Sequence, residues 1–138
     1  MIQLKTLDHL VLTVASIHKT CDFYSKVLGM NVETFNPPSD PQSTRYALKF
    51  GTMKINLHQQ GKEFQPCARE PVPGSEDLCF ILDEKAQVNS ISGVVEFLSS
   101  MKVVIEEGPI RRTGANGPIN SVYIRDPDQN LIEISTYD

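Results

Sequence analysis

The predicted secondary structure occurs in the same order twice along this chain, and this repeat limits the possible folds more than any other feature. In each half, a strand precedes a helix and three further strands follow it. A connector at residues 61–75, with three prolines, two glycines and no periodicity, separates the halves. We therefore predict an α+β fold of two βαβββ modules that form a curved mixed sheet, with the helices on its outer face.

The first half carries clear local signals for its elements. Residues 7–14 alternate between apolar and polar side chains and predict a strand. Ser16 can cap the helix that follows, whose apolar spacing continues to Leu28 and stops at Gly29. Three strands are then predicted at residues 31–35, 45–50 and 53–59, the last two as a hairpin.

The second half repeats this order less distinctly. A strand is predicted at residues 76–82, and apolar spacing from Val88 to Leu98 predicts the helix. Residues 108–118 are rich in glycine and proline and are read as a loop. The three remaining strands are predicted at residues 103–107, 120–125 and 130–136.

Composition excludes several classes of function. The 138 residues suit one domain, with module 1 at about 5–60, the connector at 61–75 and module 2 at about 76–138. A net charge of −4 argues against nucleic acid and anionic membranes as partners, and no apolar run approaches the length of a membrane span. Residues 1–5 lack the apolar core of a signal peptide, and three cysteines without a CxxC spacing fit a reducing compartment. We therefore expect a cytoplasmic protein.

One face of the predicted strands gathers residues with metal-ligand chemistry. The first strand of each half carries one such residue, His9 or Asp77, and the last strand carries another, His58 or Glu133. If the two polar faces close into a cup, His9, His58 and Glu133 would meet there as ligands of a divalent Zn, Ni, Fe, Mn or Co ion. The complete polar face comprises His9, Arg45, Lys49, Asn56, His58, Asp77, Cys79, Ser121, Tyr123, Arg125 and Glu133.

Each of these residues also has an ordinary structural interpretation. A single histidine on a strand is commonly exposed or hydrogen-bonded, and Glu133 could pair with Arg125 or Lys54. Arg112 and its neighbour Arg111 could clamp an anionic group of a substrate or form an exposed basic turn. The equivalent positions in the two halves favour the metal site for His9, His58 and Glu133, while both interpretations of the arginines stay open.

Three stretches of the chain resemble the vicinal oxygen chelate superfamily, which includes glyoxalase I, fosfomycin-resistance proteins and extradiol dioxygenases. LDHLVL at residues 7–12 resembles its opening strand, and FYSKVLGM at 23–30 resembles the end of its helix. DPDQNLIE at 126–133 resembles its closing strand, although Gln129 replaces the usual glycine. The resemblance extends over roughly residues 5–137 and supports the two-module fold.

Several shorter stretches resemble the glyoxalase domain-containing protein 5 group within this superfamily. They are INLH at residues 55–58, GKEF at 61–64, PVPGS at 71–75, IEEGP at 105–109 and RTGANGPI at 112–119. The resemblance implies His9, His58 and Glu133 as metal ligands, with Asp77 as a candidate fourth ligand. It also implies a homodimer.

The implied activity is a metal-dependent lyase or isomerase acting on a small substrate with neighbouring oxygens. Asp77 or Glu133 would act as the base, while Tyr123, Arg112 and Asn56 would bind the substrate. An extradiol dioxygenase with a two-His-one-Glu iron site, a fosfomycin-resistance-like transferase and a metal-free binding protein remain alternatives. For the dioxygenase, the only further histidine is His18, which lies in the first predicted helix.

Overall fold

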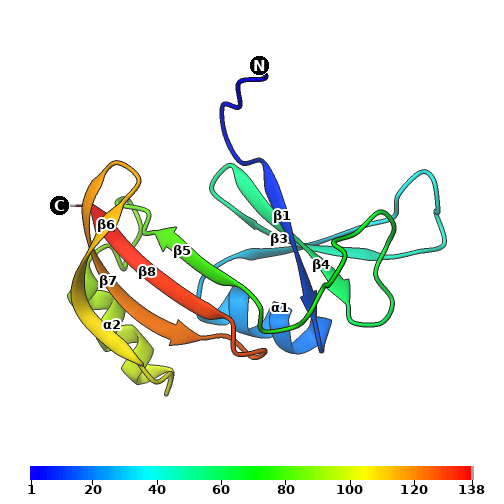
Figure 1. The fold of residues 1–138 in the computed structure, drawn as a ribbon. Coiled ribbons are helices and arrows are strands. Elements are labelled where there is room, and N and C mark those ends of the chain that lie inside the picture. The colour runs from blue at the N-terminus through cyan, green and yellow to red at the C-terminus, as the bar shows by residue number, and fades with distance from the viewer. Residues whose placement is uncertain (138) are drawn as a thin grey trace. The chain divides into compact units, whose positions relative to one another are not determined.

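The computed structural model describes residues 1–137, and the chain divides into two compact units (Figure 1). The first unit comprises Met1–Pro73, and the second begins at Gly74. Each unit has the order strand, helix, strand, strand, strand, so the predicted α+β fold of two βαβββ modules is confirmed. Each module forms its own four-stranded mixed sheet. Within the described residues, no helix is long and apolar enough to cross a membrane.

The first unit consists of β1 (His9–Val14), α1 (Ile17–Lys26), β2 (Asn31–Phe35), β3 (Arg45–Phe50) and β4 (Met53–Gln59). Its strand order is β1-β4-β3-β2, with β1 parallel to β4 and the other pairs antiparallel. Helix α1 begins where the Ser16 side chain accepts a hydrogen bond from the Lys19 backbone N–H at 3.3 Å.

Helix α1 packs on β2, β3 and β4 and covers one face of the first sheet. Leu48, Ile55 and Leu57 are almost completely buried on that face. Tyr46 also lies there, since its ring contacts the His18 ring of α1 at 6.3 Å. Successive residues of a strand point to opposite faces of the sheet. Asn56, which lies between Ile55 and Leu57, therefore points to the face away from α1, as do the residues that alternate with the buried ones in β3 and β4.

The second unit consists of β5 (Asp77–Ile81), α2 (Ile91–Ser100), β6 (Glu107–Gly114), β7 (Gly117–Arg125) and β8 (Leu131–Tyr137). Its strand order is β5-β8-β7-β6, which repeats the arrangement of the first unit. Helix α2 packs on β7, and Val94, Leu98, Val122 and Ile124 are buried.

Two predictions for the second unit were wrong. The helix begins at Ile91 rather than at Val88, because the Ser90 side chain caps it by accepting the Gly93 backbone N–H at 3.1 Å. The predicted strand at 103–107 and loop at 108–118 are replaced by β6 and the start of β7, which form a hairpin. Strand β6 tolerates Pro109 because it lies at the edge of the sheet and its register shifts between Glu107 and Ile110.

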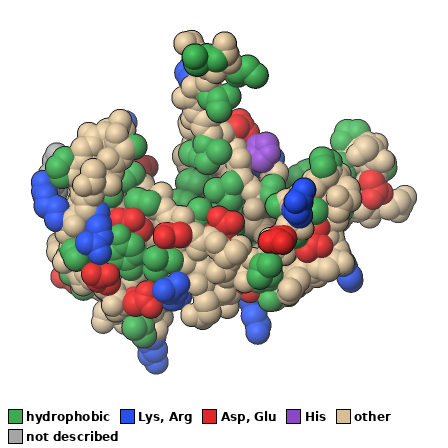
Figure 2. Space-filling model, viewed as in Figure 1, with side chains coloured by type: hydrophobic (Ala, Val, Ile, Leu, Met, Phe, Trp, Pro, Cys, Tyr) green, Lys and Arg blue, Asp and Glu red, His purple; other side chains and the backbone are tan. Residues whose placement is uncertain are grey.

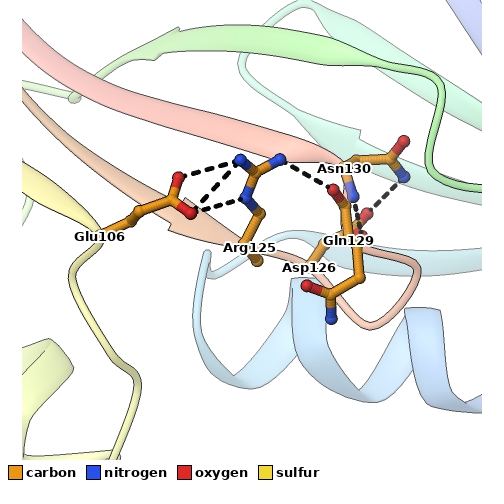
Figure 3. A network of polar contacts seen from close by, with 5 residues as sticks. All are labelled: Glu106, Arg125, Asp126, Gln129 and Asn130. Atoms are coloured by element: carbon orange, nitrogen blue, oxygen red, sulfur yellow. Dashed lines mark hydrogen bonds and ion pairs between the residues drawn. The ribbon is translucent and has the colours of Figure 1, made fainter.

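The turn between β7 and β8 is held by a buried carboxylate (Figure 3). Asp126 accepts hydrogen bonds from the backbone N–H groups of Asp128 and Asn130 and from the Asn130 amide, at 2.8–3.0 Å. The side-chain oxygen Oδ1 of Asn130 in turn accepts a hydrogen bond from the backbone N–H of Glu76 at 2.9 Å. Gln129 has a φ of 70°, so this turn keeps the left-handed conformation that glycine favours. The turn therefore joins the start of β8 to the segment before β5.

Candidate functional site

The first sheet carries a polar face opposite α1. The parallel register of β1 and β4 pairs His9 with Lys54, Val11 with Asn56 and Thr13 with His58. Asn56 therefore lies between the positions of the two histidines. His9 and His58 are separated by four register positions, roughly 13 Å along the strands.

His58 is buried on this face and has an unused ring nitrogen. Its side chain is 8% exposed, and its ring packs edge-to-face on Phe64 at 5.6 Å between centroids. Among residues 1–137, Nδ1 has no hydrogen-bond partner. Burial and, to a smaller extent, the positive charge of Arg45 lower the pKa of His58, against a smaller opposite effect of Glu63. The imidazole is therefore neutral at pH 7 and can donate a lone pair to a ligand.

Two further polar atoms next to His58 are buried without partners in the described part of the chain. They are Oδ1 of Asn56 and Nε of Arg45. The Arg45 guanidinium lies 4.0 Å from the centroid of the Phe64 ring, so this aromatic ring contacts both Arg45 and His58. A buried polar group without a partner costs about 1–3 kcal/mol, which indicates that a water molecule or a ligand completes this region.

His9 lies at the exposed start of β1 and interacts with its neighbour Asp8. Its Nδ1 is 2.7 Å from the Asp8 carboxylate. This hydrogen bond is the main reason that the pKa of Asp8 is lowered. A carboxylate that accepts the Nδ1 proton leaves Nε2 with its lone pair, as in many metal-binding histidines.

Glu133 lies on β8 between Cys79 of β5 and Tyr123 of β7 in the second sheet. The Ser121 hydroxyl donates to Oε1 of Glu133 at 2.6 Å, and Ser135 approaches the same oxygen at 3.5 Å. Both serines are completely buried and lie 2.7 Å apart. These hydroxyl groups hold the carboxylate in one position.

Asp77 shares the sheet face of Glu133 but does not adjoin it in register. It is exposed at the start of β5, opposite Leu131, whereas Cys79 is opposite Glu133. Two residues along a strand correspond to roughly 7 Å. Asp77 is therefore in the neighbourhood of Glu133, and its role as ligand or base stays a prediction.

Arg112 lies on β6, where it contacts Tyr123 and Glu107. Its Nε donates to the Tyr123 hydroxyl oxygen at 3.0 Å, and its Nη2 donates to Glu107 at 3.2 Å. Burial is the main reason that the pKa of Tyr123 is raised; the bond from Arg112 opposes this effect, and Glu133 adds to it. The Tyr123 hydroxyl stays protonated at neutral pH and can donate a hydrogen bond.

The proposed metal ligands belong to different units, His9 and His58 to the first and Glu133 to the second. Within residues 1–137, no group of three or more His, Cys, Asp or Glu side chains is arranged to hold a metal ion. The register does not place His9 and His58 side by side, and at roughly 13 Å along the strands they could share one ion only if both side chains lean toward each other. Each proposed ligand nevertheless has the chemistry that a divalent metal requires. His9 is oriented by Asp8, His58 is neutral with an unused nitrogen, and Glu133 is held by Ser121.

The sequence of this chain matches the model of a known protein family. The model of the Glyoxalase/Bleomycin resistance protein/Dioxygenase superfamily matches residues 6–134. The chain belongs to this superfamily. The resemblance seen in the opening strand, the first helix and the closing strand is thereby confirmed.

Two curated relatives in the superfamily are similar over nearly the whole chain. The glyoxalase domain-containing protein RDO1 of Mycosarcoma maydis is 48% identical, and the match covers 99% of this chain and 70% of that protein. The virulence protein STM3117 of Salmonella typhimurium is 52% identical, with 95% of this chain and 83% of that protein covered.

Solved structures of the superfamily agree with the fold. The crystal structure of STM3117 has a TM-score of 0.89 and 50% identity, covering 99% of this chain and 100% of that chain. FosX, a fosfomycin resistance protein from Listeria monocytogenes complexed with Mn(II) and sulfate, has a TM-score of 0.60 and 17% identity. That match covers 99% of this chain and 95% of FosX, and it shows a shared fold only.

Sequence reasoning placed Arg45 and Ser121 on the polar face but assigned no role to either. Their positions followed from strand alternation, whereas their contacts did not. Phe64 lies in the connector, which has no periodicity, so nothing in the sequence pattern predicted its contact with Arg45 and His58.

Proposed function

We propose that this chain is a divalent-metal-dependent enzyme of the glyoxalase type. It would act as a lyase or isomerase on a small substrate with two neighbouring oxygens. His9, His58 and Glu133 are the proposed ligands of the metal, which would be Zn, Ni, Fe, Mn or Co. The observation that carries this proposal is the buried, neutral imidazole of His58, whose Nδ1 has no partner in residues 1–137.

The protein's own residues would orient the reacting groups. Asp8 and Ser121 hold His9 and Glu133 through hydrogen bonds of 2.7 and 2.6 Å. When bound, the metal supplies a Lewis acid that stabilises negative charge on the substrate oxygens. Tyr123 would donate a hydrogen bond to a substrate oxygen, and Arg112 orients that hydroxyl.

Two carboxylates in the second unit are available for proton transfer. Asp77 is exposed and lies on the same sheet face as Glu133. Asp77, or Glu133 if it releases the metal, would remove a proton from the carbon beside a substrate carbonyl. The Asn56 amide, on the polar face of the first unit, would bind a polar group of the substrate.

Metal analysis by mass spectrometry tests this function directly. Protein purified without added metal, and protein incubated with each of the five metals, should contain about one ion per chain. Zn or Ni in the protein purified without added metal would favour the lyase or isomerase. Bound Fe with oxygen uptake on catechols would favour the dioxygenase. No bound transition metal after incubation would refute all the enzyme hypotheses.

A metal-free binding protein is the second candidate function. It is favoured by the three unpartnered atoms of Arg45, Asn56 and His58, which can bind a polar ligand without any metal. Under this hypothesis, small ligands bind equally well before and after treatment with a chelator. The metal analysis therefore separates the two candidates.

We also propose that the protein is a homodimer. The apolar side chains of Met1, Ile2 and Leu4 are at least 88% exposed in the N-terminal segment, at the top of the view in Figure 2. Burial of such side chains in a partner copy would stabilise association. Light scattering at micromolar concentration should give twice the chain mass of 15.4 kDa. A monomer under these conditions would contradict the proposal.

A further inference from the structure

Three cations lie on the β3/β4 polar face, which we define by Arg45, Lys49, Lys54, Asn56 and His58. The cations are half-buried, and none of them has a carboxylate within ion-pair distance in the described residues. Lys49 is directly opposite Lys54 in the antiparallel register, where like charges repel. This excess of positive charge occurs in a chain whose net charge is −4.

Two carboxylates, Asp8 and Glu63, act electrostatically on residues of this face, but among the described residues neither forms an ion pair with its three cations. Asp8 interacts with the charges of both lysines, but its oxygen is bonded to His9 at 2.7 Å. Glu63 accepts the backbone N–H of Gly61 at 2.9 Å. The positive charge of this face is therefore not balanced by an ion pair within the unit.

Arg45 is the most firmly positioned of these cations. Its guanidinium stacks on Phe64 at 4.0 Å, which fixes the plane of the group. Its Nε is buried without a partner, and so are Oδ1 of Asn56 and Nδ1 of His58. The register that pairs Tyr46 with Leu57 brings Arg45 next to His58 across the two strands. Unpaired hydrogen-bonding atoms of Asn56 and His58 therefore lie close to the planar guanidinium of Arg45.

Water alone does not account for this arrangement. An ordered water molecule could satisfy Asn56 or His58, but it could not balance the charge of a half-buried guanidinium. An anion would satisfy the Nε–H donor of Arg45 and balance its charge at the same time, whereas Oδ1 of Asn56 is an acceptor and would need a water molecule or another donor. The backbone positions of the two lysines lie four residues along the strands from Arg45 and His58, roughly 13 Å away. The Lys54 Nζ, however, lies 5.1 Å from the centroid of the Phe35 ring, and Phe35 is opposite Arg45 in the β2–β3 register, so this charge also attracts an anion near Arg45.

We propose that the β3/β4 polar face binds the anionic group of the small-molecule ligand, a carboxylate or a phosphonate, with Arg45 as the residue that anchors it. The proposal rests on the proposed function, because it takes this ligand to be the substrate of the enzyme. Binding of the anion itself depends only on residues of the first unit. It can therefore be measured whether or not the protein binds a metal.

Calorimetric titration of the full chain with benzoate and phenylphosphonate tests this inference, and neutral benzamide serves as the uncharged probe. The wild type should bind one or both anions more tightly than benzamide, and more weakly at high salt. Arg45→Gln should weaken anion binding roughly tenfold or more, because a charged hydrogen bond is lost. The preference between the two anions distinguishes a carboxylate site from a phosphonate site.

The exposed Arg69 provides a matched control. Arg69→Gln removes the same charge and should leave the affinity for the anions unchanged. Arg45→Lys should recover part of the affinity lost in Arg45→Gln, which a misfolded variant would not do. Metal content should be the same in Arg45→Gln and the wild type, so loss of anion binding is distinct from loss of the metal.

Three results would overturn the inference. They are equal anion affinity in Arg45→Gln and Arg69→Gln, benzamide binding as tight as benzoate binding, and no saturable binding of either anion to the wild type. The titrations are repeated after chelator treatment. A protein that binds anions through Arg45 but never binds metal would refute the proposed metal-dependent enzyme and leave the anion site supported.

Discussion

Replacing Glu133 with alanine is expected to weaken binding of the divalent metal at least about 100-fold, with the fold retained. The substitution removes one of the three proposed ligands. It leaves no buried hydroxyl without a partner, because Ser121 and Ser135 lie 2.7 Å apart and can hydrogen-bond to each other. Competition with a chromophoric chelator measures the affinity, and circular dichroism checks the fold.

Matched histidine variants show whether this loss is specific. His9→Ala and His58→Ala should lose the metal to a similar extent, whereas His18→Ala should retain it, since His18 is exposed on α1. Ser121→Ala should weaken binding by about tenfold, because Ser121 only orients the carboxylate. Wild-type affinity in Glu133→Ala and His58→Ala would exclude this set of ligands.

Asn130→Ala is expected to destabilise the protein by about 2–3 kcal/mol. The amide is 1% exposed and joins the Asp126 carboxylate to the backbone N–H of Glu76 through hydrogen bonds of 2.8 and 2.9 Å. Its removal leaves a buried carboxylate oxygen short of a donor and frees the segment before β5. Urea unfolding should show a lower midpoint with an unchanged slope.

The exposed Asn31 at the start of β2 is the control for this change. Asn31→Ala should alter stability by less than about 0.5 kcal/mol, as surface substitutions usually do. If the two alanine variants unfold at the same urea concentration, the amide of Asn130 is not the link that we infer. The role of this turn would then have to be sought in the Asp126 carboxylate itself.

Local patterns predicted the first unit more accurately than the second. The strands at Asn31–Phe35, Arg45–Phe50 and Met53–Gln59 have the predicted bounds, because apolar alternation and a tight turn mark their ends. The prediction missed β6, because Pro109 and the glycines around it are typical of a loop. Pairing with β7 at the edge of the sheet overrides that local preference, and no local pattern reports it.

The closing motif illustrates a different limit of sequence reasoning. Its resemblance to a metal-binding family drew attention to Glu133, yet its most buried polar groups are Asp126 and Asn130, which hold a turn. The proposed ligand and the groups that hold the turn lie within one short stretch. Sequence alone did not separate the ligand chemistry from the structural hydrogen bonds, because that separation depends on which groups are buried together.

The sequence by itself determined the repeated βαβββ order and the face of each strand, because both follow from the periodicity of neighbouring side chains. It thereby placed Arg45, Asn56 and His58 on one face. Only the tertiary structure decided that Phe64 of the connector stacks on Arg45 and that three polar atoms there are buried without partners. These contacts join strand residues to a connector that has no periodic pattern of apolar side chains. They therefore arise from tertiary packing and cannot be read from the local sequence.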